Sequence, residues 1–183
     1  TYWASVVRRT CGLIGDFIVN DISAGEDDPL MLSTVGELGL TYIAMHKRGN
    51  PATMSLMTEY EDVAHDIKAY FDEFSNRAEC NGIKDWILDP GIGFSKTIDQ
   101  NYELLKSLEV FKSVRVAEGR SPRILVGVSR KSLIYKYLNI SPDESLPATQ
   151  VLNFAALQNG ADILRVHDVA EAARTVALYR QLA

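Results

Sequence analysis

The chain has 183 residues, of which 46% are hydrophobic and 23% charged, and its formal net charge is −5. This composition is typical of a globular domain that is long enough to bury a substantial core. No apolar run approaches the roughly 20 residues that a bilayer crossing requires, so a membrane is excluded as a partner. Nucleic acid is disfavoured as well, because phosphate binding usually requires a basic face.

The opening residues, TYWASVVRRT, lack a basic segment followed by a long apolar stretch, which argues against a secretory signal. They include no initial Met and start within a helical pattern, so we expect that upstream sequence is missing. Cys11 and Cys80 are far apart and have no partner motif, which is typical of reduced thiols in the cytoplasm. We therefore predict a single, partial domain over residues 1–183 and a cytoplasmic location.

Five short apolar runs recur along the chain, rich in β-branched and aromatic residues. They are too short for buried helices, and their near-continuous apolarity is typical of strands covered on both faces in a parallel sheet. The runs cover residues 17–19, 42–45, 86–88, 124–128 and 163–166.

The segments between these runs have helical period. Residues 2–13 predict a helix that is already in progress, and the apolar positions from Val63 to Ala78 predict a long one. Thr58 with Glu61 has the spacing of a capping box for that long helix.

Later helices carry similar signals. Thr97 with Gln100 predicts the start of one helix, and Asp168 with Glu171 predicts the start of the last. Asn159-Gly160 predicts a helix stop. Strict alternation of helices and parallel strands leaves an open doubly wound sheet or a closed barrel.

The strand ends help to choose between these architectures. Every run ends in polar residues, which a buried strand end does not otherwise require. In a barrel all such ends converge on one face, whereas in an open sheet only those near the switch point share a ligand. Polar tips on all five runs therefore favour a (β/α)₈ barrel. The tips are Asn20-Asp21, His46-Lys47-Arg48, Asp89, Ser129-Arg130-Lys131-Ser132, and Arg165 with His167.

Asp89 and the residues after it form the first candidate site. The sequence Asp89-Pro-Gly-Ile-Gly-Phe94 lets the backbone turn sharply, and the carboxylate can accept paired N–H donors from a planar heterocycle. The alternative is a turn that merely leaves the strand.

The last two tips are basic. The segment from Ser129 to Ser132 precedes a helical stretch and suits an anion, unless it is only a solvated helix start. Arg165 and His167 are two residues apart on a strand, so they share a face, and Arg can grip phosphate or stack on a ring. Neighbouring carboxylates that satisfy both side chains are the alternative.

The remaining polar candidates are less specific. Asn20-Asp21 can contact the same ligand, although Asn-Asp is also common in turns. His46 is as consistent with a structural histidine as with a functional one, and His65 belongs to a charged helix face. The Cys, His and acidic residues have no metal-ligand spacing.

Five motifs in order resemble those of the dihydropteroate synthases, from the fourth barrel strand to the end. They are Asn20 to Gly25, Met45 to Pro51, Asp89 to Phe94, Gly127 to Ser132, and Arg165 to Val169. A pterin-binding methyltransferase of the same superfamily is the neighbouring possibility, but methyl transfer needs no grip on pyrophosphate.

The resemblance implies that p-aminobenzoate condenses with 6-hydroxymethyl-7,8-dihydropterin pyrophosphate, giving dihydropteroate and pyrophosphate. It also implies the catalytic residues and the residues that bind substrate. The catalytic residues are Lys131, Arg165 and His167, and the substrate-binding residues are Asn20, Asp21, Met45, Asp89, Phe94, Gly127, Lys131, Ser132, Arg165 and His167.

The family's two mobile substrate loops, the aspartate after its third strand and the loop that helps ligate Mg²⁺ have no counterpart in the 183 residues. Mg²⁺ is therefore a cofactor implied by the resemblance alone. We expect little turnover from this chain by itself, or a remnant that binds pterin without chemistry. The resemblance also implies competition by sulfonamides and a possible homodimer.

Overall fold

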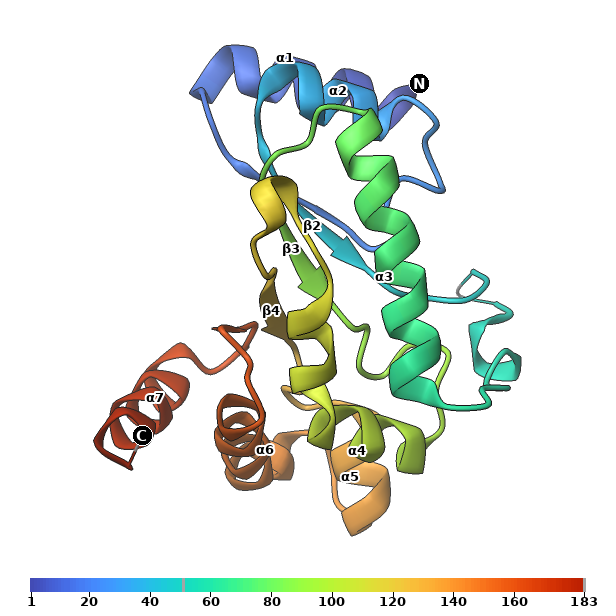
Figure 1. Cartoon of the computed structure of the whole chain (residues 1–183). Helices are drawn as coiled ribbons and strands as arrows, with labels where there is room; N and C mark the ends of the chain where they lie inside the picture. The colour runs from blue at the N-terminus through green and yellow to red at the C-terminus, as the bar shows by residue number, and fades with distance from the viewer. Residues whose placement is uncertain (51, 183) are drawn as a thin grey trace.

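The computed structural model describes residues 1–50 and 52–182, so that Pro51, at the end of the second motif, lies outside the described residues. Five parallel strands form one sheet, and each pairs with its neighbour in the chain (Figure 1). They are β1 (Ile18–Asp21), β2 (Thr41–Met45), β3 (Trp86–Asp89), β4 (Arg123–Val126) and β5 (Ile163–Leu164).

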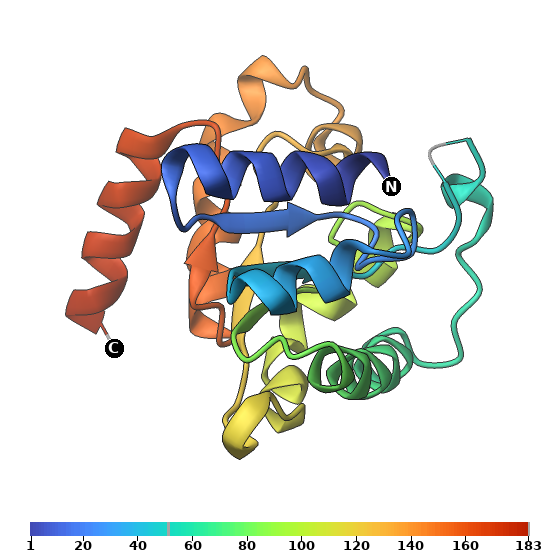
Figure 2. The same ribbon diagram turned by 90° about the horizontal axis from the view of Figure 1, so that it is seen from above.

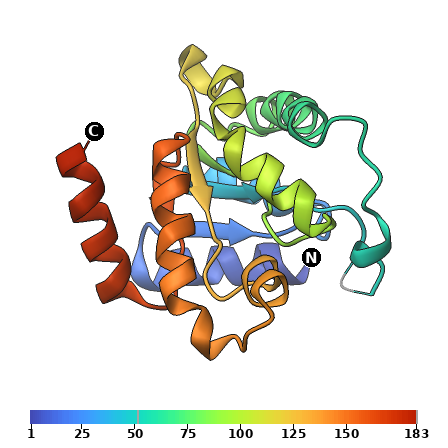
Figure 3. The same cartoon turned by 90° about the horizontal axis from the view of Figure 1, so that it is seen from below.

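Helices connect successive strands, as the sequence predicts. They are α1 (Tyr2–Ile14), α2 (Met31–Leu38), α3 (Val63–Cys80), α4 (Ile98–Lys106), α5 (Ser132–Leu138), α6 (Leu146–Gln158) and α7 (Val169–Leu182), with short 3₁₀ helices at Met54–Leu56, Leu108–Ser113, Ala117–Gly119 and Asp143–Ser145. Figure 2 shows α1 and α2 running beside β1, and Figure 3 shows α7 outermost, beyond α6. No helix in the described residues is long and apolar enough to span a membrane.

The strand order decides between the two architectures. A doubly wound sheet reverses its order at a switch point, whereas the order here runs β1-β2-β3-β4-β5 without reversal. Sequential parallel pairing with helical crossovers is the pattern of a (β/α)₈ barrel, of which this chain forms five βα units. The predicted barrel class is confirmed.

The two faces of the sheet are buried differently. Outward-facing residues such as Tyr42, Trp86 and Ile124 pack beneath the helices in the main core. The residues between them point to the other face and form a small apolar cluster of their own. That cluster comprises Ile43, Ile87, Leu125 and the partly buried Ile163. A layer of branched residues from successive strands is how the interior of a barrel is filled.

The start of α3 corrects one of the predictions. Asp62, not the Thr58 and Glu61 pair, caps α3, because its Oδ1 accepts the N–H groups of Ala64 and His65, each at 3.0 Å. The last helix begins where Asp168 and Glu171 predict, because α7 starts at Val169. The Asp168 carboxylate accepts hydrogen bonds from Arg130, at 3.0 and 2.7 Å.

Two other helix signals are confirmed. Thr97 and Gln100 form the predicted capping box, with reciprocal hydrogen bonds of 2.9 and 3.2 Å. Helix α6 ends at Gln158, followed by Asn159 and by Gly160 at a φ of 100°.

Candidate active site

The polar strand tips meet above the inner apolar layer. Successive residues of a strand alternate between faces, so the residue two positions beyond each layer member points the same way. In β2 to β5 these next residues are Met45, Asp89, Gly127 and Arg165. Met45, Asp89 and Arg165 therefore lie on the same face at the carboxyl ends of their strands. Gly127, which has no side chain, lies between Asp89 and Arg165.

Arg165 crosses from the fifth strand to the third. Its guanidinium Nη2 lies 3.1 Å from Oδ2 of Asp89, and it passes over Gly127 of the strand between them. A Cβ atom on Gly127 would be 3.2 Å from that Nη2 and 3.3 Å from Nε. The missing side chain is therefore what lets the arginine lie across the strand.

Asp89 is a desolvated carboxylate with one free acceptor. It is 1% exposed, and burial raises the pKa of its carboxyl against the lowering effect of Arg165, the Gly91 N–H, Lys131 and Lys96. Oδ1 accepts the Gly91 N–H at 2.9 Å. Oδ2 accepts no hydrogen bond from the described residues, because the nearby Arg165 nitrogen is within ion-pair distance without being aligned to donate. A ligand N–H could fill that position.

Lys131 closes another side of the same site. Its Nζ donates to the Ile92 carbonyl oxygen and lies 4.9 Å from the centre of the Phe94 ring. Burial lowers the pKa of Lys131 to about 8, opposed by the Asp89 carboxylate and reinforced by Arg165. The turn after β3 and the tip of β4 are thus joined through one lysine.

Arg165 and His167 line a small cavity with the tip of β4. The cavity has a volume of about 120 Å³ and its walls are Gly127, Ser129, Lys131, Arg165, Val166 and His167. Ser129, which is 4% exposed, accepts the backbone N–H of His167 at 3.3 Å, and its Oγ lies 3.0 Å from Nδ1 of that ring. Ser132 is half-buried as the first residue of α5, next to Lys131.

Asn20 and Asp21 lie apart from this cluster, and Met45 is fully buried beside it. Asp21 accepts four hydrogen bonds, from Ser23 N–H and Oγ–H, from Gly25 N–H and from the Tyr42 hydroxyl. Asn20 and Asp21 line a separate hollow of about 440 Å³ beside β1. Met45 is fully buried next to Asp89. Ligand contacts from all three remain predictions.

Sequence reasoning missed Lys96. This lysine follows the glycine turn, and its Nζ contacts His46 Nδ1 at 3.2 Å as well as two carbonyl oxygens of the turn. A lysine after Gly-Phe-Ser resembles any exposed lysine in the sequence, so only its burial marks it. His65, interpreted as a surface residue, is exposed.

The charges of the site favour an anion although the chain is acidic overall. Lys96, Lys131 and Arg165 surround the single carboxylate of Asp89. In the described residues, no group of three or more His, Cys, Asp or Glu side chains is placed to hold a metal ion. Residues 1–50 and 52–182 therefore hold no such group of ligands for the Mg²⁺ that the resemblance implies, and Mg²⁺ remains a prediction.

These features define a class of protein, a (β/α)₈ barrel fold with a cluster of cations around a buried carboxylate at the carboxyl ends of its strands. A family model described as "Pterin binding enzyme" matches residues 1–167. The chain belongs to this pterin-binding enzyme family.

Similar proteins agree with the family. Dihydropteroate synthase of Escherichia coli K12 is 38% identical over 92% of this chain. The Yersinia pestis dihydropteroate synthase, in a sulfonamide drug complex, superposes on all of this chain and 64% of its own with a TM-score of 0.89 and 30% identity. The Thermus thermophilus enzyme in complex with 6HMPPP matches all of this chain and 70% of its own (TM-score 0.86, 29% identity), and it has also been solved with 4-aminobenzoate. The chain spans 60% of the length of the Escherichia coli enzyme.

Proposed function

We propose that this chain carries the pterin and pyrophosphate site of a dihydropteroate synthase. The whole enzyme would condense 6-hydroxymethyl-7,8-dihydropterin pyrophosphate with p-aminobenzoate to give dihydropteroate and pyrophosphate. The observation that carries the proposal is the buried Asp89 carboxylate, with one acceptor free among the described residues and three cations around it. A pterin offers adjacent N–H donors to such a carboxylate, and its pyrophosphate is drawn to the cations.

In this reaction negative charge develops on the leaving pyrophosphate and positive charge on the pterin methylene carbon, and the protein must stabilise both. The bond between the pterin methylene carbon and the pyrophosphate oxygen breaks, and the oxygen keeps the electron pair. The amine of p-aminobenzoate then attacks the methylene carbon, forms the new C–N bond and releases a proton. Arg165, His167 and Lys131 would stabilise the leaving pyrophosphate, because preformed cations act most strongly where negative charge develops.

The second substrate would lie beside the turn after β3. There the ammonium group of Lys131 lies over the ring of Phe94. Ser132, the next residue, is the first of α5. Support comes from the relatives solved with 4-aminobenzoate and with a sulfonamide drug. Sulfonamides would compete for this position. Low turnover by the 183 residues alone, a homodimer and a cytoplasmic location remain predictions.

Calorimetry with the pterin pyrophosphate tests the proposal. Asp89→Asn should weaken binding by about 10- to 150-fold, because a charge-assisted hydrogen bond is worth about 1.5–3 kcal/mol. Asp85→Asn is the matched control at the opposite end of β3, where the carboxylate pairs with Arg123 at 2.8 Å. Equal affinities of the two variants, or no binding by the parent chain, would refute the proposed site.

A further inference from the structure

Lys96 is a half-buried cation at the end of the turn after β3. Its Nζ donates to the carbonyl oxygens of Gly91 and Phe94, at 3.0 and 2.9 Å. Its third contact is Nδ1 of His46, 3.2 Å away on the tip of β2. An ammonium group has three protons to donate and accepts nothing, so these three partners use all of its donors.

The lysine fixes the tautomer of the histidine. Because the ammonium can only donate, Nδ1 of His46 accepts and the ring proton is on Nε2. Burial, followed by the charges of Lys96 and Arg48, lowers the pKa of His46 to about 2, so that the ring is neutral. Burial also lowers the pKa of Lys96 to about 7, which Asp89 opposes and Lys131 and Arg48 reinforce.

The turn fits closely against the tip of β2. A Cβ atom on Gly91 would lie only 1.9 Å from the carbonyl oxygen of His46, so glycine is required at this point of closest approach. Gly91 also has a φ of 70°. The ammonium of Lys96 and this backbone contact together hold the two tips as one unit.

The same turn carries the partners of Lys131. The Ile92 carbonyl oxygen accepts from its Nζ, and the Phe94 ring lies against that atom. Any shift of the turn therefore moves both the aromatic ring and the lysine that border the proposed substrate positions. The three contacts of the Lys96 Nζ are all with the protein itself.

We propose that Lys96 is a positioning residue, whose ammonium ties residues 91–94 to His46 and so sets where Lys131 and Phe94 meet the ligand. The ligand part of this inference rests on the proposed function. The hydrogen bonds of Lys96 to the turn and to His46 are present in the free protein, so their effect can be measured without any ligand.

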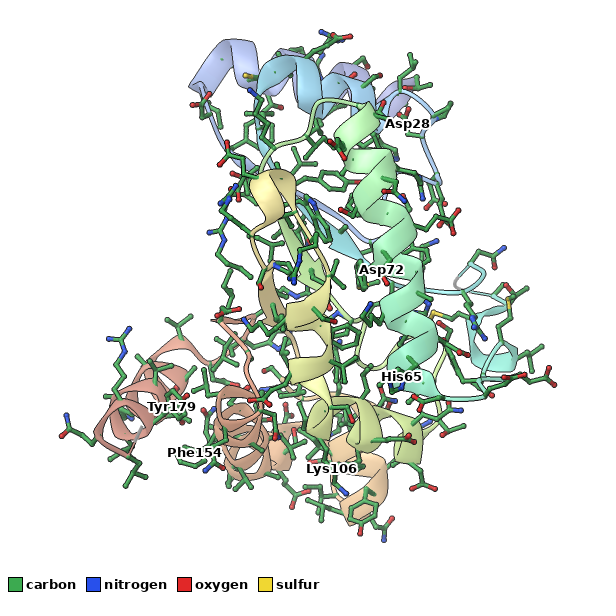
Figure 4. The ribbon with its side chains drawn as sticks, in the orientation of Figure 1. Asp28, His65, Asp72, Lys106, Phe154 and Tyr179 are labelled. Atoms are coloured by element: carbon green, nitrogen blue, oxygen red, sulfur yellow. The ribbon has the colours of Figure 1, made fainter. Side chains whose placement is uncertain are left out.

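The test compares Lys96→Met with Lys106→Met in the 183-residue chain. Methionine keeps the length of the side chain and removes every donor. Lys106 is an exposed lysine in the last turn of α4, the helix that begins just after Lys96 (Figure 4). Amide hydrogen exchange at Gly91, Gly93 and Phe94 reports the turn, and ¹⁵N NMR of His46 reports its tautomer.

In Lys96→Met, exchange of these three amides should accelerate by about tenfold or more, whereas Lys106→Met should leave it unchanged. At about pH 5 to 6, below the Lys96 pKa of about 7, the parent chain should show His46 as the Nε2–H tautomer, because the charged ammonium can only donate. Calorimetry with the pterin pyrophosphate should show about tenfold weaker binding for Lys96→Met alone.

Two results would overturn the inference. One is a proton on Nδ1 of His46 in the parent chain, a measurement that stands even if Lys96→Met does not fold. The other is unchanged exchange of the turn in a folded Lys96→Met variant. If the parent chain fails to bind the pterin pyrophosphate, the proposed function fails, and the exchange rates and the tautomer still decide the role of Lys96.

Discussion

Arg165 lies across Gly127 and places its guanidinium 3.1 Å from the carboxylate of Asp89, two strands away. The ion pair therefore spans the tip of β4. Oδ2 of Asp89 accepts no hydrogen bond from the described residues, which leaves it for a ligand N–H. The side chain of Arg165 is 37% exposed, so a ligand can reach the guanidinium as well.

Gly127→Ala should weaken binding of the pterin pyrophosphate by about tenfold while the chain stays folded. The new methyl group would lie 3.2 Å from Nη2 of Arg165, closer than ordinary contact, so the guanidinium must shift. Loss of one well-placed contact of a charged group costs about 1.5 kcal/mol. Calorimetry measures the effect. Gly12→Ala in α1, where nothing lies within 4 Å of the added atom, is the control. Unchanged affinity in Gly127→Ala would mean that the position of Arg165 does not matter.

Affinity for the pyrophosphate should fall as the pH rises through about 8. Below the Lys131 pKa of about 8 the ammonium is charged and attracts the anion, and above it the charge is lost. One proton changes the affinity by at most about tenfold per pH unit. Titrations of inorganic pyrophosphate at several pH values, with the parent chain and Lys131→Gln, would check this. Lys136→Gln, an exposed lysine on α5, should keep the parental pH dependence. Parallel curves for the parent and Lys131→Gln would assign the proton elsewhere.

Asp62→Ala should destabilise the chain by about 1 kcal/mol, and Thr58→Ala should have a much smaller effect. Asp62 caps two N–H groups at the start of α3, whereas the Thr58 side chain caps none of them. Urea unfolding of the two variants measures the difference. A larger loss from Thr58→Ala would show that the capping box read from the sequence forms in solution.

The comparison of these two caps shows where sequence reasoning stops. Thr58 and Glu61 have the right spacing, but Asp62, one residue before the helix, accepts its first free N–H groups instead. Both candidates lie close together in the sequence, and spacing alone does not distinguish them. The strands were predictable because continuous apolar runs of about three to five residues have few other stable uses.

The residues of the candidate site were also predictable from the sequence only in part. Asp89 and Arg165 could be found because charged residues at the ends of apolar runs need a reason to be there. Lys96 could not, because its burial arises only when the turn folds back on β2. For Asp21 the residue type suggested a ligand contact, but its carboxylate holds the turn after β1 through Ser23 and Gly25.

Stability should fall as the pH is lowered below about 6.5, in part through His46. Its pKa in the folded chain is about 2, against an ordinary value of 6.5. Between pH 6.5 and about 2, His46 binds a proton in the unfolded state but not in the native state, so lowering the pH favours unfolding. The slope from this one group is at most about 1.4 kcal/mol per pH unit. His46→Asn removes the titration and keeps an acceptor near Lys96, so its unfolding free energy should depend less on pH from about 6 to 4. Urea unfolding at a series of pH values measures both curves, with the exposed His65→Asn as the control. Identical slopes for the parent and His46→Asn would show that the buried ring takes up a proton without cost, and that Lys96 does not keep it neutral.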